Sequence, residues 1–258
     1  MAAADDVPLH QERAGVGPRL VLLHGFAQTG RCWGPLADAL AVDHEVVRVD
    51  APGHGGSATV RADLPTTAGL AAEAAGPGVY VGYSMGARMA LHVALQAPDV
   101  VQGLVLISGT PGIEDPAERA ARHQRDRALA HQIRQRGVDA FLEDWLAQPM
   151  FAGLPAWARF DEERRRNPAE GLATSLELAG TGSQEPLWPQ LGRIAAPVLA
   201  LAGERDERYA DIAKRMAATI GADATAALVP DAGHAAHLEK PDATLAILRP
   251  WLATLTAP

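Results

Sequence analysis

Cysteine, aromatic residues and long apolar runs are all scarce in this sequence. The single cysteine, Cys32, excludes an intramolecular disulfide framework and is typical of a reducing compartment, so we interpret it as a packing residue and expect a cytoplasmic protein. No stretch reaches the roughly 18 apolar residues that cross a bilayer, and the first residues lack the basic flank and apolar core of a signal peptide. We therefore expect no membrane partner.

Positive charge is also in deficit. The chain has 23 Lys and Arg against 31 Asp and Glu, a net charge of -8, which argues against a general nucleic-acid-binding surface. His234 and His237 form a pair with no third ligand in view, which is poor evidence for zinc. The 258 residues fit one large α/β domain with a substantial core, and we expect a monomer or a small homo-oligomer.

Short apolar segments alternate with helical ones along most of the chain. This alternation predicts a mostly parallel central sheet with helices on both faces, so catalytic groups would gather at the carboxyl ends of the strands. The predicted strands are 20–23, 45–49, 79–83, 103–108, 197–202 and 225–229.

One long interval interrupts the alternation. Residues 111–190 contain no strand-like run and are dominated by helical periodicity and charge, which predicts an all-helical cap over the active site. Residues 1–110 and 191–258 would then form the core of the domain.

A Gly-x-Ser-x-Gly pentapeptide, Gly82 to Gly86, stands between an apolar run and a helix-forming run. In that setting the glycines allow a sharp turn that exposes the hydroxyl of Ser84, which is the nucleophile elbow of α/β-hydrolases. The pentapeptide alone is weak evidence. Upstream, an apolar strand runs into His24-Gly25-Phe26, and the backbone N–H groups of Phe26 and Met85 would form an oxyanion hole.

Two later strands end in loops that carry an acid and a histidine. Asp206 follows the strand at 197–202, and His234 follows the strand at 225–229, so the chain order is Ser84, Asp206, His234. That order is the one of the α/β-hydrolase triad, in which the acid orients the histidine and the histidine takes the serine proton.

Other residues compete for these two roles. His237 lies near the expected base, and we interpret it as packing or capping; His54, in the turn-rich loop 49–57, is given a structural role. The alternatives to Asp206 are the three neighbouring acids Glu204, Glu207 and Asp211.

Arginines are concentrated in the predicted cap. They could bind an anionic substrate, because guanidinium groups hold carboxylates bidentately. They could equally form exposed i,i+4 pairs, such as Asp115 with Arg119, Glu118 with Arg122 and Glu162 with Arg166. The cap arginines are Arg119, Arg122, Arg125, Arg127, Arg134, Arg136, Arg159, Arg164, Arg165 and Arg166. Arg88 differs, because it follows Ser84 by one helical turn and must be paired or meet a ligand.

Several segments together resemble one family. The sequence is similar to the 2-succinyl-6-hydroxy-2,4-cyclohexadiene-1-carboxylate synthases of menaquinone biosynthesis, and the resemblance covers nearly the whole chain. It rests on 24–26, 49–57 and 82–88 in the core and on 108–112, 115–122, 141–145, 148–151, 180–184 and 187–188 in and around the cap.

This resemblance implies a lyase on a hydrolase fold. Such an enzyme eliminates pyruvate from 2-succinyl-5-enolpyruvyl-6-hydroxy-3-cyclohexene-1-carboxylate, with the triad serine acting as a base and with no cofactor or metal. It implies that Ser84, Asp206 and His234 are catalytic and that Phe26 and Met85 form the oxyanion hole. Arg88, Arg122 and Arg165 would bind substrate carboxylates, with Arg164 and Arg166 left open as neighbours of Arg165, and Tyr83 and Trp145 would line the pocket.

Two other functions stay open at this point. A histidine-activated serine can act as base or as nucleophile, so a carboxylesterase or a carbon–carbon bond hydrolase is the alternative. A ligand-binding protein that kept the fold is a third possibility, and an intact triad argues against it.

Overall fold

The computed structural model describes residues 8–255. Its centre is a seven-stranded sheet in the order β1-β3-β2-β4-β5-β6-β7, in which only β1 runs antiparallel to its neighbour. The strands are β1 (Gln11–Ala14), β2 (Arg19–Leu23), β3 (Glu45–Val49), β4 (Gly78–Tyr83), β5 (Val101–Ile107), β6 (Val198–Gly203) and β7 (Ala224–Val229). The predicted α/β fold, with its mostly parallel sheet, is confirmed. The edge strand β1 was not predicted, because its sequence Gln-Glu-Arg-Ala lacks an apolar pattern.

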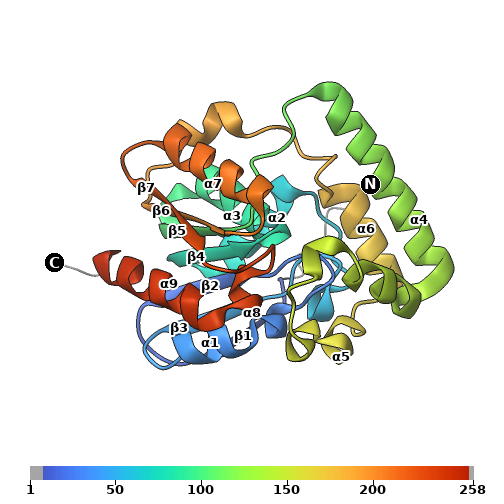
Figure 1. The fold of residues 1–258 in the computed structure, drawn as a ribbon, viewed down its shortest axis with the longest axis horizontal. Helices are drawn as coiled ribbons and strands as arrows, with labels where there is room; N and C mark the ends of the chain where they lie inside the picture. The colour runs from blue at the N-terminus through green and yellow to red at the C-terminus, as the bar shows by residue number, and fades with distance from the viewer. Residues whose placement is uncertain (1–7, 256–258) are drawn as a thin grey trace.

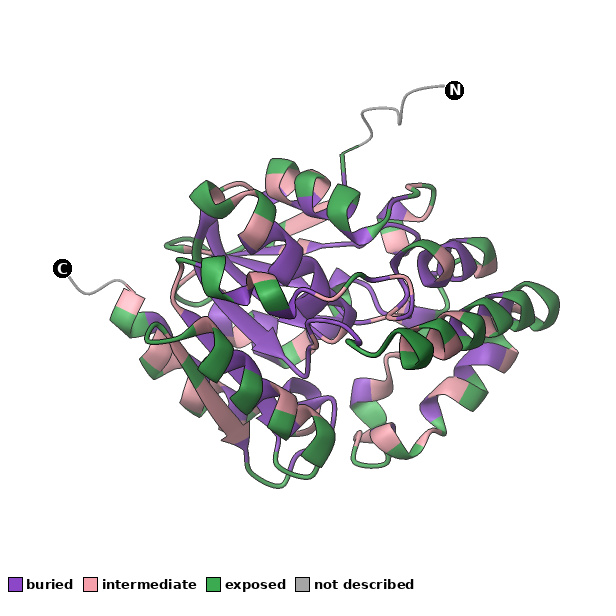
Figure 2. Ribbon diagram, turned by 90° about the horizontal axis from the view of Figure 1, so that it is seen from above, coloured by how far each residue is buried: buried purple, intermediate pink, exposed green. Residues whose placement is uncertain are grey.

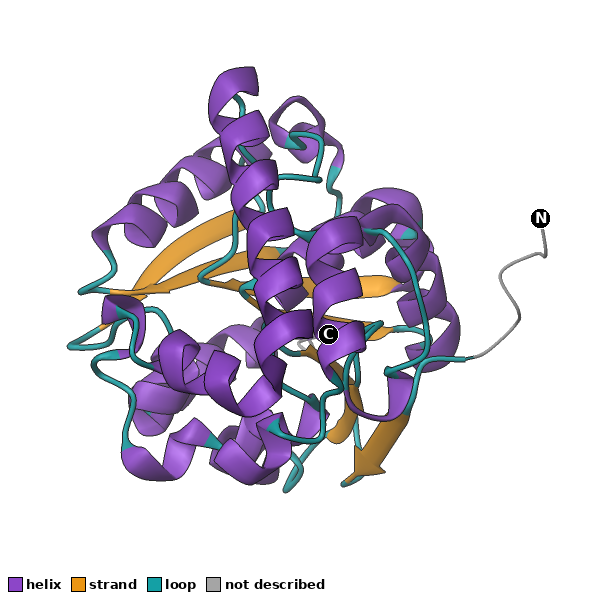
Figure 3. Ribbon diagram, turned by 90° about the vertical axis from the view of Figure 1, so that its right-hand side faces the viewer, coloured by secondary structure: helices purple, strands orange, loops and turns teal. Residues whose placement is uncertain are grey.

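Helices cover both faces of the sheet, as Figures 1 and 3 show. Neighbouring residues of β5 illustrate the two layers: Leu106 belongs to an apolar cluster with Met89, whereas Ile107 belongs to a second cluster with Leu248. Successive side chains of a strand point to opposite faces, so a central strand covered on both faces is apolar throughout. The central strands and the inner sides of the helices are accordingly buried in Figure 2, whereas the edge strands β1 and β7 are partly exposed.

The helices of the core lie between and after the strands in the chain. They are α1 (Gly34–Leu40), α2 (Leu64–Ala75), α3 (Met85–Gln96), α7 (Glu207–Ile220), α8 (Ala236–Glu239) and α9 (Pro241–Leu255). Short 3-10 segments are η1 (Gly30–Trp33), η2 (Gly55–Ser57), η3 (Pro98–Val100), η4 (Pro149–Phe151), η5 (Ala156–Arg159) and η6 (Trp188–Arg193). No helix in residues 8–255 is long and apolar enough to cross a membrane.

The segment between β5 and β6 consists of helices and turns. It contains α4 (Pro116–Leu146), α5 (Asp161–Arg164) and α6 (Ala169–Ala179), and α4 bends at Gly137, which has φ 79°. Ile133 and Phe141 of α4 pack with Leu172 of α6, so the segment has an apolar cluster of its own. Figure 1 shows α4 and α6 side by side at one end of the sheet. We refer to residues 111–190 as the cap, and its bounds stay a prediction from the sequence.

Candidate active site

Ser84 lies in a strained turn between β4 and α3. Its backbone has φ 51° and ψ −105°, a conformation that a residue with a side chain rarely adopts. A Cβ atom on Gly82 would overlap the main chain of Gly86, and one on Gly86 would overlap the carbonyl oxygen of Leu23. Both glycines are therefore required by close backbone approach, and together they hold the serine hydroxyl at the carboxyl end of the sheet.

The structure brings Ser84, His234 and Asp206 together. His234 Nε2 is 3.2 Å from Ser84 Oγ, and His234 Nδ1 is 2.7 Å from Asp206 Oδ2. The Asp206 carboxylate also accepts a hydrogen bond from the N–H of Tyr209 at the start of α7. His234 is only 2% exposed, and its ring lies 4.5 Å from that of Tyr209. This arrangement fixes the imidazole orientation needed for it to take a proton from the serine.

The alternative acids and the second histidine have other contacts. Glu204 accepts a hydrogen bond from the N–H of Asp231, and Asp211 pairs with Lys214. Glu207 is exposed in the first turn of α7. His237 packs its ring 4.4 Å from that of Tyr83, and burial lowers the pKa of His237 to about 3.

The loop after β2 places the backbone of Phe26 beside the serine. The N–H of Gly25 donates to Gln28 Oε1, that of Gln28 to the Gly25 carbonyl, and that of Ala27 to His54 Nε2. Within residues 8–255 these bonds leave the Phe26 N–H as the free donor of the turn. Met85 is the first residue of α3, where backbone N–H groups have no acceptor within the helix.

His54 supports this loop through its hydrogen bond with the Ala27 N–H. Its Nδ1 is 2.9 Å from the Pro52 carbonyl, so both ring nitrogens have backbone partners. The ring is fully buried, and this burial lowers the pKa of His54 to about 3. A neutral imidazole that holds the Phe26 turn is a structural role.

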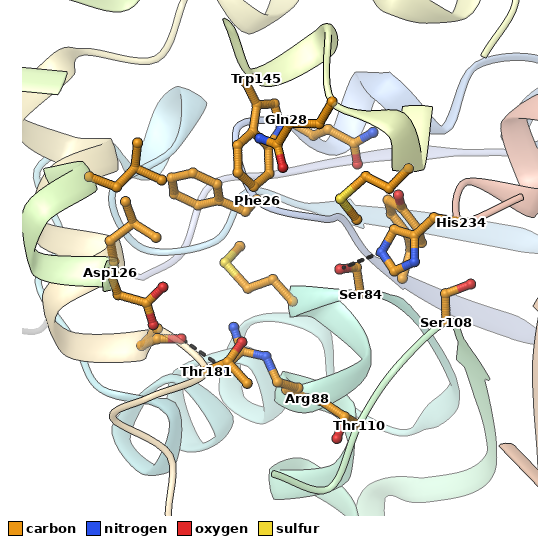
Figure 4. Close-up of a pocket in the computed structure, with 18 of the residues that line it drawn as sticks. Phe26, Gln28, Ser84, Arg88, Ser108, Thr110, Asp126, Trp145, Thr181 and His234 are labelled. Carbon is orange, nitrogen blue, oxygen red and sulfur yellow. Dashed lines mark hydrogen bonds between the residues drawn. The ribbon is translucent and has the colours of Figure 1, made fainter. Parts of the chain in front are cut away.

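A cavity of about 500 Å³ lies between the core and the cap, with Ser84 in its wall. Core and cap residues face one another across it in Figure 4. Of the residues singled out from the sequence, it is lined by Phe26, Tyr83, Ser84, Met85, Arg88, Arg122, Trp145, Asp206 and His234. No group of three His, Cys, Asp or Glu side chains in the described part of the chain could hold a metal ion.

Arg88 is a buried cation in this cavity. It is 6% exposed and donates hydrogen bonds to the Ala179 carbonyl at 2.8 Å and to Gln184 Oε1 at 3.3 Å. None of the described carboxylates pairs with it. Burial, together with the nearby Arg122, lowers the pKa of Arg88 to about 10. A buried charge without a counter-ion is costly, so the site favours binding of an anion.

The expected i,i+4 pairs of the cap are not the ones that form. Arg122 Nε bonds to Asp126 Oδ1 at 2.8 Å rather than to Glu118. Arg119 approaches Glu185, and Arg166 pairs with Glu163. Asp126 is buried, and its other oxygen accepts the N–H of Gly182, so Arg122 is anchored at the wall of the cavity.

The structure does not place Arg165 at the cavity, where it was expected. Its side chain is half exposed and bonds to Asp139 at 2.7 Å, outside the cavity. Arg164 lines the cavity instead: it is 1% exposed and donates to the carbonyls of Arg159 and Ala27. Burial lowers its pKa, and no carboxylate among residues 8–255 pairs with it. The direction of the short helix α5 decides which of three consecutive arginines faces inward.

Several other polar residues line the cavity and were not singled out as site residues from the sequence. Ser108 directly follows β5, and its position at a strand end was a usable signal. Asp126 lies four residues after Arg122, a spacing that the sequence also contained. The remaining polar lining residues include Gln28, Arg125, Tyr209 and Arg208.

This fold and this triad define the class of the protein. Residues 20–247 match the model of a family described as the alpha/beta hydrolase family, to which the chain belongs. The chain is 34% identical over 244 residues to the 2-succinyl-6-hydroxy-2,4-cyclohexadiene-1-carboxylate synthase of Escherichia coli O1:K1 / APEC, covering 90% of this chain and 92% of that protein. Within the larger family, the chain therefore belongs to the family of 2-succinyl-6-hydroxy-2,4-cyclohexadiene-1-carboxylate synthases.

Solved structures agree with this assignment. MenH from S. aureus matches with a TM-score of 0.88 and 29% identity, covering 96% of this chain and 99% of that one. A thermophilic esterase from Thermogutta terrifontis matches with a TM-score of 0.84 and 24% identity over 96% and 94% of the two chains, a likeness that shows the fold alone.

Proposed function

We propose that this protein eliminates pyruvate from 2-succinyl-5-enolpyruvyl-6-hydroxy-3-cyclohexene-1-carboxylate, which yields 2-succinyl-6-hydroxy-2,4-cyclohexadiene-1-carboxylate. One observation carries the proposal: a cavity of about 500 Å³ holds a Ser-His-Asp triad together with two buried arginines that no described carboxylate neutralises. The substrate bears three carboxylates, on the ring, the succinyl chain and the enolpyruvyl group. Fixed cations in the wall of a cavity suit such a molecule.

The triad supplies the base. Ser84 Oγ passes its proton to His234 Nε2 and removes the hydrogen on ring carbon 2, which is acidic because it is α to the succinyl ketone. Asp206 stabilises the imidazolium that forms. The pair of electrons from the C–H bond makes an enolate, whose oxygen the N–H groups of Phe26 and Met85 would hold.

Collapse of this enolate completes the reaction. The electrons form a double bond between ring carbons 2 and 3, the existing double bond shifts to carbons 4 and 5, and the bond from carbon 5 to the enolpyruvyl oxygen breaks. The leaving group departs as the enolate of pyruvate and takes the proton held by His234. The products are pyruvate and a conjugated diene, so no redox partner or hydrolytic water is needed.

The arginines would orient the substrate. Arg88 and Arg122 lie on the side of the cavity formed by α3 and α4, while Arg164 belongs to α5 and donates a hydrogen bond to the loop after β2. Carboxylates bound at separate points would fix ring carbon 2 against Ser84. Tyr83 and Trp145 line the cavity beside Ser84 and Phe26, respectively. In this proposal Arg164 takes the role that the sequence assigned to Arg165.

The alternative is a serine hydrolase, because the same triad and oxyanion hole could carry an acyl-enzyme. The two functions are separated by following pyruvate release and diene absorbance with the proposed substrate, beside hydrolysis of p-nitrophenyl acetate. Wild type, Ser84→Ala and Arg122→Ala are compared. We expect fast elimination that both substitutions abolish or greatly slow, with poor ester turnover. Ester cleavage that depends on Ser84, without elimination, would instead establish the hydrolase.

Three further expectations from the sequence belong to this proposal. They are a small anionic polycarboxylate as the partner with no nucleic acid, a monomer or small homo-oligomer, and a cytoplasmic location. The acidic balance supports the exclusion of nucleic acid, and the single cysteine supports the cytoplasmic location.

A further inference from the structure

Gln28 places an amide in the wall of the cavity that the proposed mechanism does not use. The residue follows Phe26 by two positions, lines the cavity and is 2% exposed. Figure 4 shows its side chain close to Trp145 and Phe26, on the opposite side of the cavity from Arg88. A buried amide normally has partners for both its oxygen and its nitrogen, so the contacts of each atom are informative.

The contacts of Gln28 settle which way its amide points. The N–H of Gly25 donates to the Gln28 side chain at 2.9 Å, and only a carbonyl oxygen can accept that bond. The oxygen of the amide is therefore turned toward the Phe26 loop. Its nitrogen is left with two N–H donors, which make no hydrogen bond to any of residues 8–255.

A second donor group, the Arg164 guanidinium, is bonded to the loop that carries Gln28. Arg164 Nη1 donates to the Ala27 carbonyl at 3.0 Å, and Asn167 Nδ2 is 3.4 Å from the Gln28 carbonyl and 2.9 Å from that of Arg164. These bonds tie α5 and the turn after it to the loop that carries Gln28. The Gln28 amide and the Arg164 guanidinium thus line the same cavity from segments that are bonded to each other, and no carboxylate among residues 8–255 pairs with Arg164.

We infer that Gln28 is a specificity-determining residue whose side-chain amide donates a hydrogen bond to the substrate carboxylate held by Arg164. This inference rests on the proposed function, because it concerns the same cavity. Arg88 and Arg122 hold the other end of the substrate, so the two ends set the spacing of the carboxylates that the cavity accepts. An analogue that lacks the carboxylate at the Arg164 end leaves both donors unpaired and is rejected.

Two substitutions of Gln28 separate its contact with substrate from its support of the loop. Gln28→Glu keeps an oxygen for the Gly25 N–H but replaces the donor by a negative charge. Gln28→Met has a similar volume and removes both functions without adding charge. Gln148→Glu, on the cap side of the same cavity, is the matched control for an added charge.

Each variant is measured in two ways at pH 8. The first is kcat and KM for pyruvate elimination. The second is calorimetric binding of 2-succinylbenzoate, an unreactive aromatic analogue that retains the ring and succinyl carboxylates. For both Gln28 variants we expect KM to rise about ten- to hundredfold, the range for a hydrogen bond to a charged group. We expect the Kd of 2-succinylbenzoate to rise by a similar factor, provided that one of its carboxylates binds at Arg164. We expect kcat to change less than KM.

The outcomes distinguish this inference from the proposed function. If wild type eliminates pyruvate and neither Gln28 variant changes KM, the role of Gln28 is refuted and the function stands. A fall in kcat at constant KM would likewise refute this role, because it would show that Gln28 only supports the loop. An equal rise in KM for Gln148→Glu would also refute it, because it would show a general effect of added negative charge. If wild type releases no pyruvate but binds 2-succinylbenzoate with at least tenfold dependence on Gln28, the function fails and the amide contact is supported.

Discussion

Arg88 Nη1 donates a hydrogen bond to the Ala179 carbonyl at 2.8 Å, which joins the helix after Ser84 to the last turn of α6 in the cap. The guanidinium is buried without a described carboxylate, so its charge is uncompensated while the cavity is empty. A group of this kind contributes to ligand binding at the expense of stability.

Replacing Arg88 should therefore separate stability from activity. For Arg88→Met we expect an unchanged or raised Tm, because a flexible apolar side chain removes a buried unpaired cation. We expect kcat/KM for elimination to fall roughly 30-fold or more, the effect of truncating one partner of a buried charge pair. Thermal unfolding and initial rates test this. A clear drop in Tm would mean that the bonds to Ala179 and Gln184 outweigh the buried charge.

Arg164 and Arg165 provide a matched pair of neighbours with opposite environments. Arg164 is buried in the cavity wall, whereas Arg165 is half exposed and bonds to Asp139. Arg164→Met should raise KM about tenfold or more, whereas Arg165→Met should leave KM within about twofold, since exposed ion pairs contribute little. Steady-state kinetics on both variants decide which of the two arginines binds the substrate. A larger effect at Arg165 would show that α5 turns when substrate binds.

Asp206 is the acid whose carboxylate is hydrogen-bonded to His234. In Asp206→Asn the amide can no longer hold the imidazole in the required tautomer, and we expect kcat to fall about 10⁴-fold with little change in KM. Glu204→Gln is the control, because Glu204 bonds to the N–H of Asp231 and not to His234. We expect its kcat within about twofold of wild type. A comparable loss of kcat in both variants would argue that both carboxylates orient His234, or that Asp206 is not the acid of the triad.

The sheet and the elbow could be predicted because local sequence determines them. Apolar runs flanked by turns indicate buried parallel strands, and the spacing of the two glycines around Ser84 marks a strand–turn–helix unit. The close contact that requires Gly82 lies within this unit, whereas the one that requires Gly86 is made with Leu23 of the neighbouring strand β2. The chain order of Ser84, Asp206 and His234 then followed from the strand ends. β1 was not predicted, because an edge strand is held by backbone hydrogen bonds to β3 and does not require an apolar sequence pattern.

The cap contacts could not be predicted, because they depend on packing between distant segments. Glu118 and Asp126 both lie four residues from Arg122, and only the burial of Asp126 beside Gly182 selects the pair that forms. The inward direction of Arg164 likewise depends on the loop after β2, 137 residues away in the chain, which accepts its hydrogen bond. Periodicity describes one helix at a time and does not contain this information.

Buried histidines give the fold a defined sensitivity to acid. Burial lowers the pKa of both His54 and His237 to about 3 and that of His92 to about 4, below the unfolded value near 6.5. The unfolded chain therefore binds protons that the native state does not. The stability from these groups is complete above pH 6.5 or so and is lost as the pH falls toward about 3.

We expect the free energy of unfolding to decrease steeply between pH 6.5 and 4.5, by up to about 1.4 kcal/mol per pH unit for each such histidine. Urea unfolding at intervals across this range measures the slope. His237→Phe is the informative variant, because a phenyl ring can keep the packing against Trp33 and Tyr83, and Nδ1 of His237 has no partner to lose among the described residues. For this variant, the slope of the unfolding free energy against pH should be smaller than in wild type by the amount that corresponds to about one bound proton. An unchanged slope would mean that His237 is protonated alike in the folded and unfolded chain.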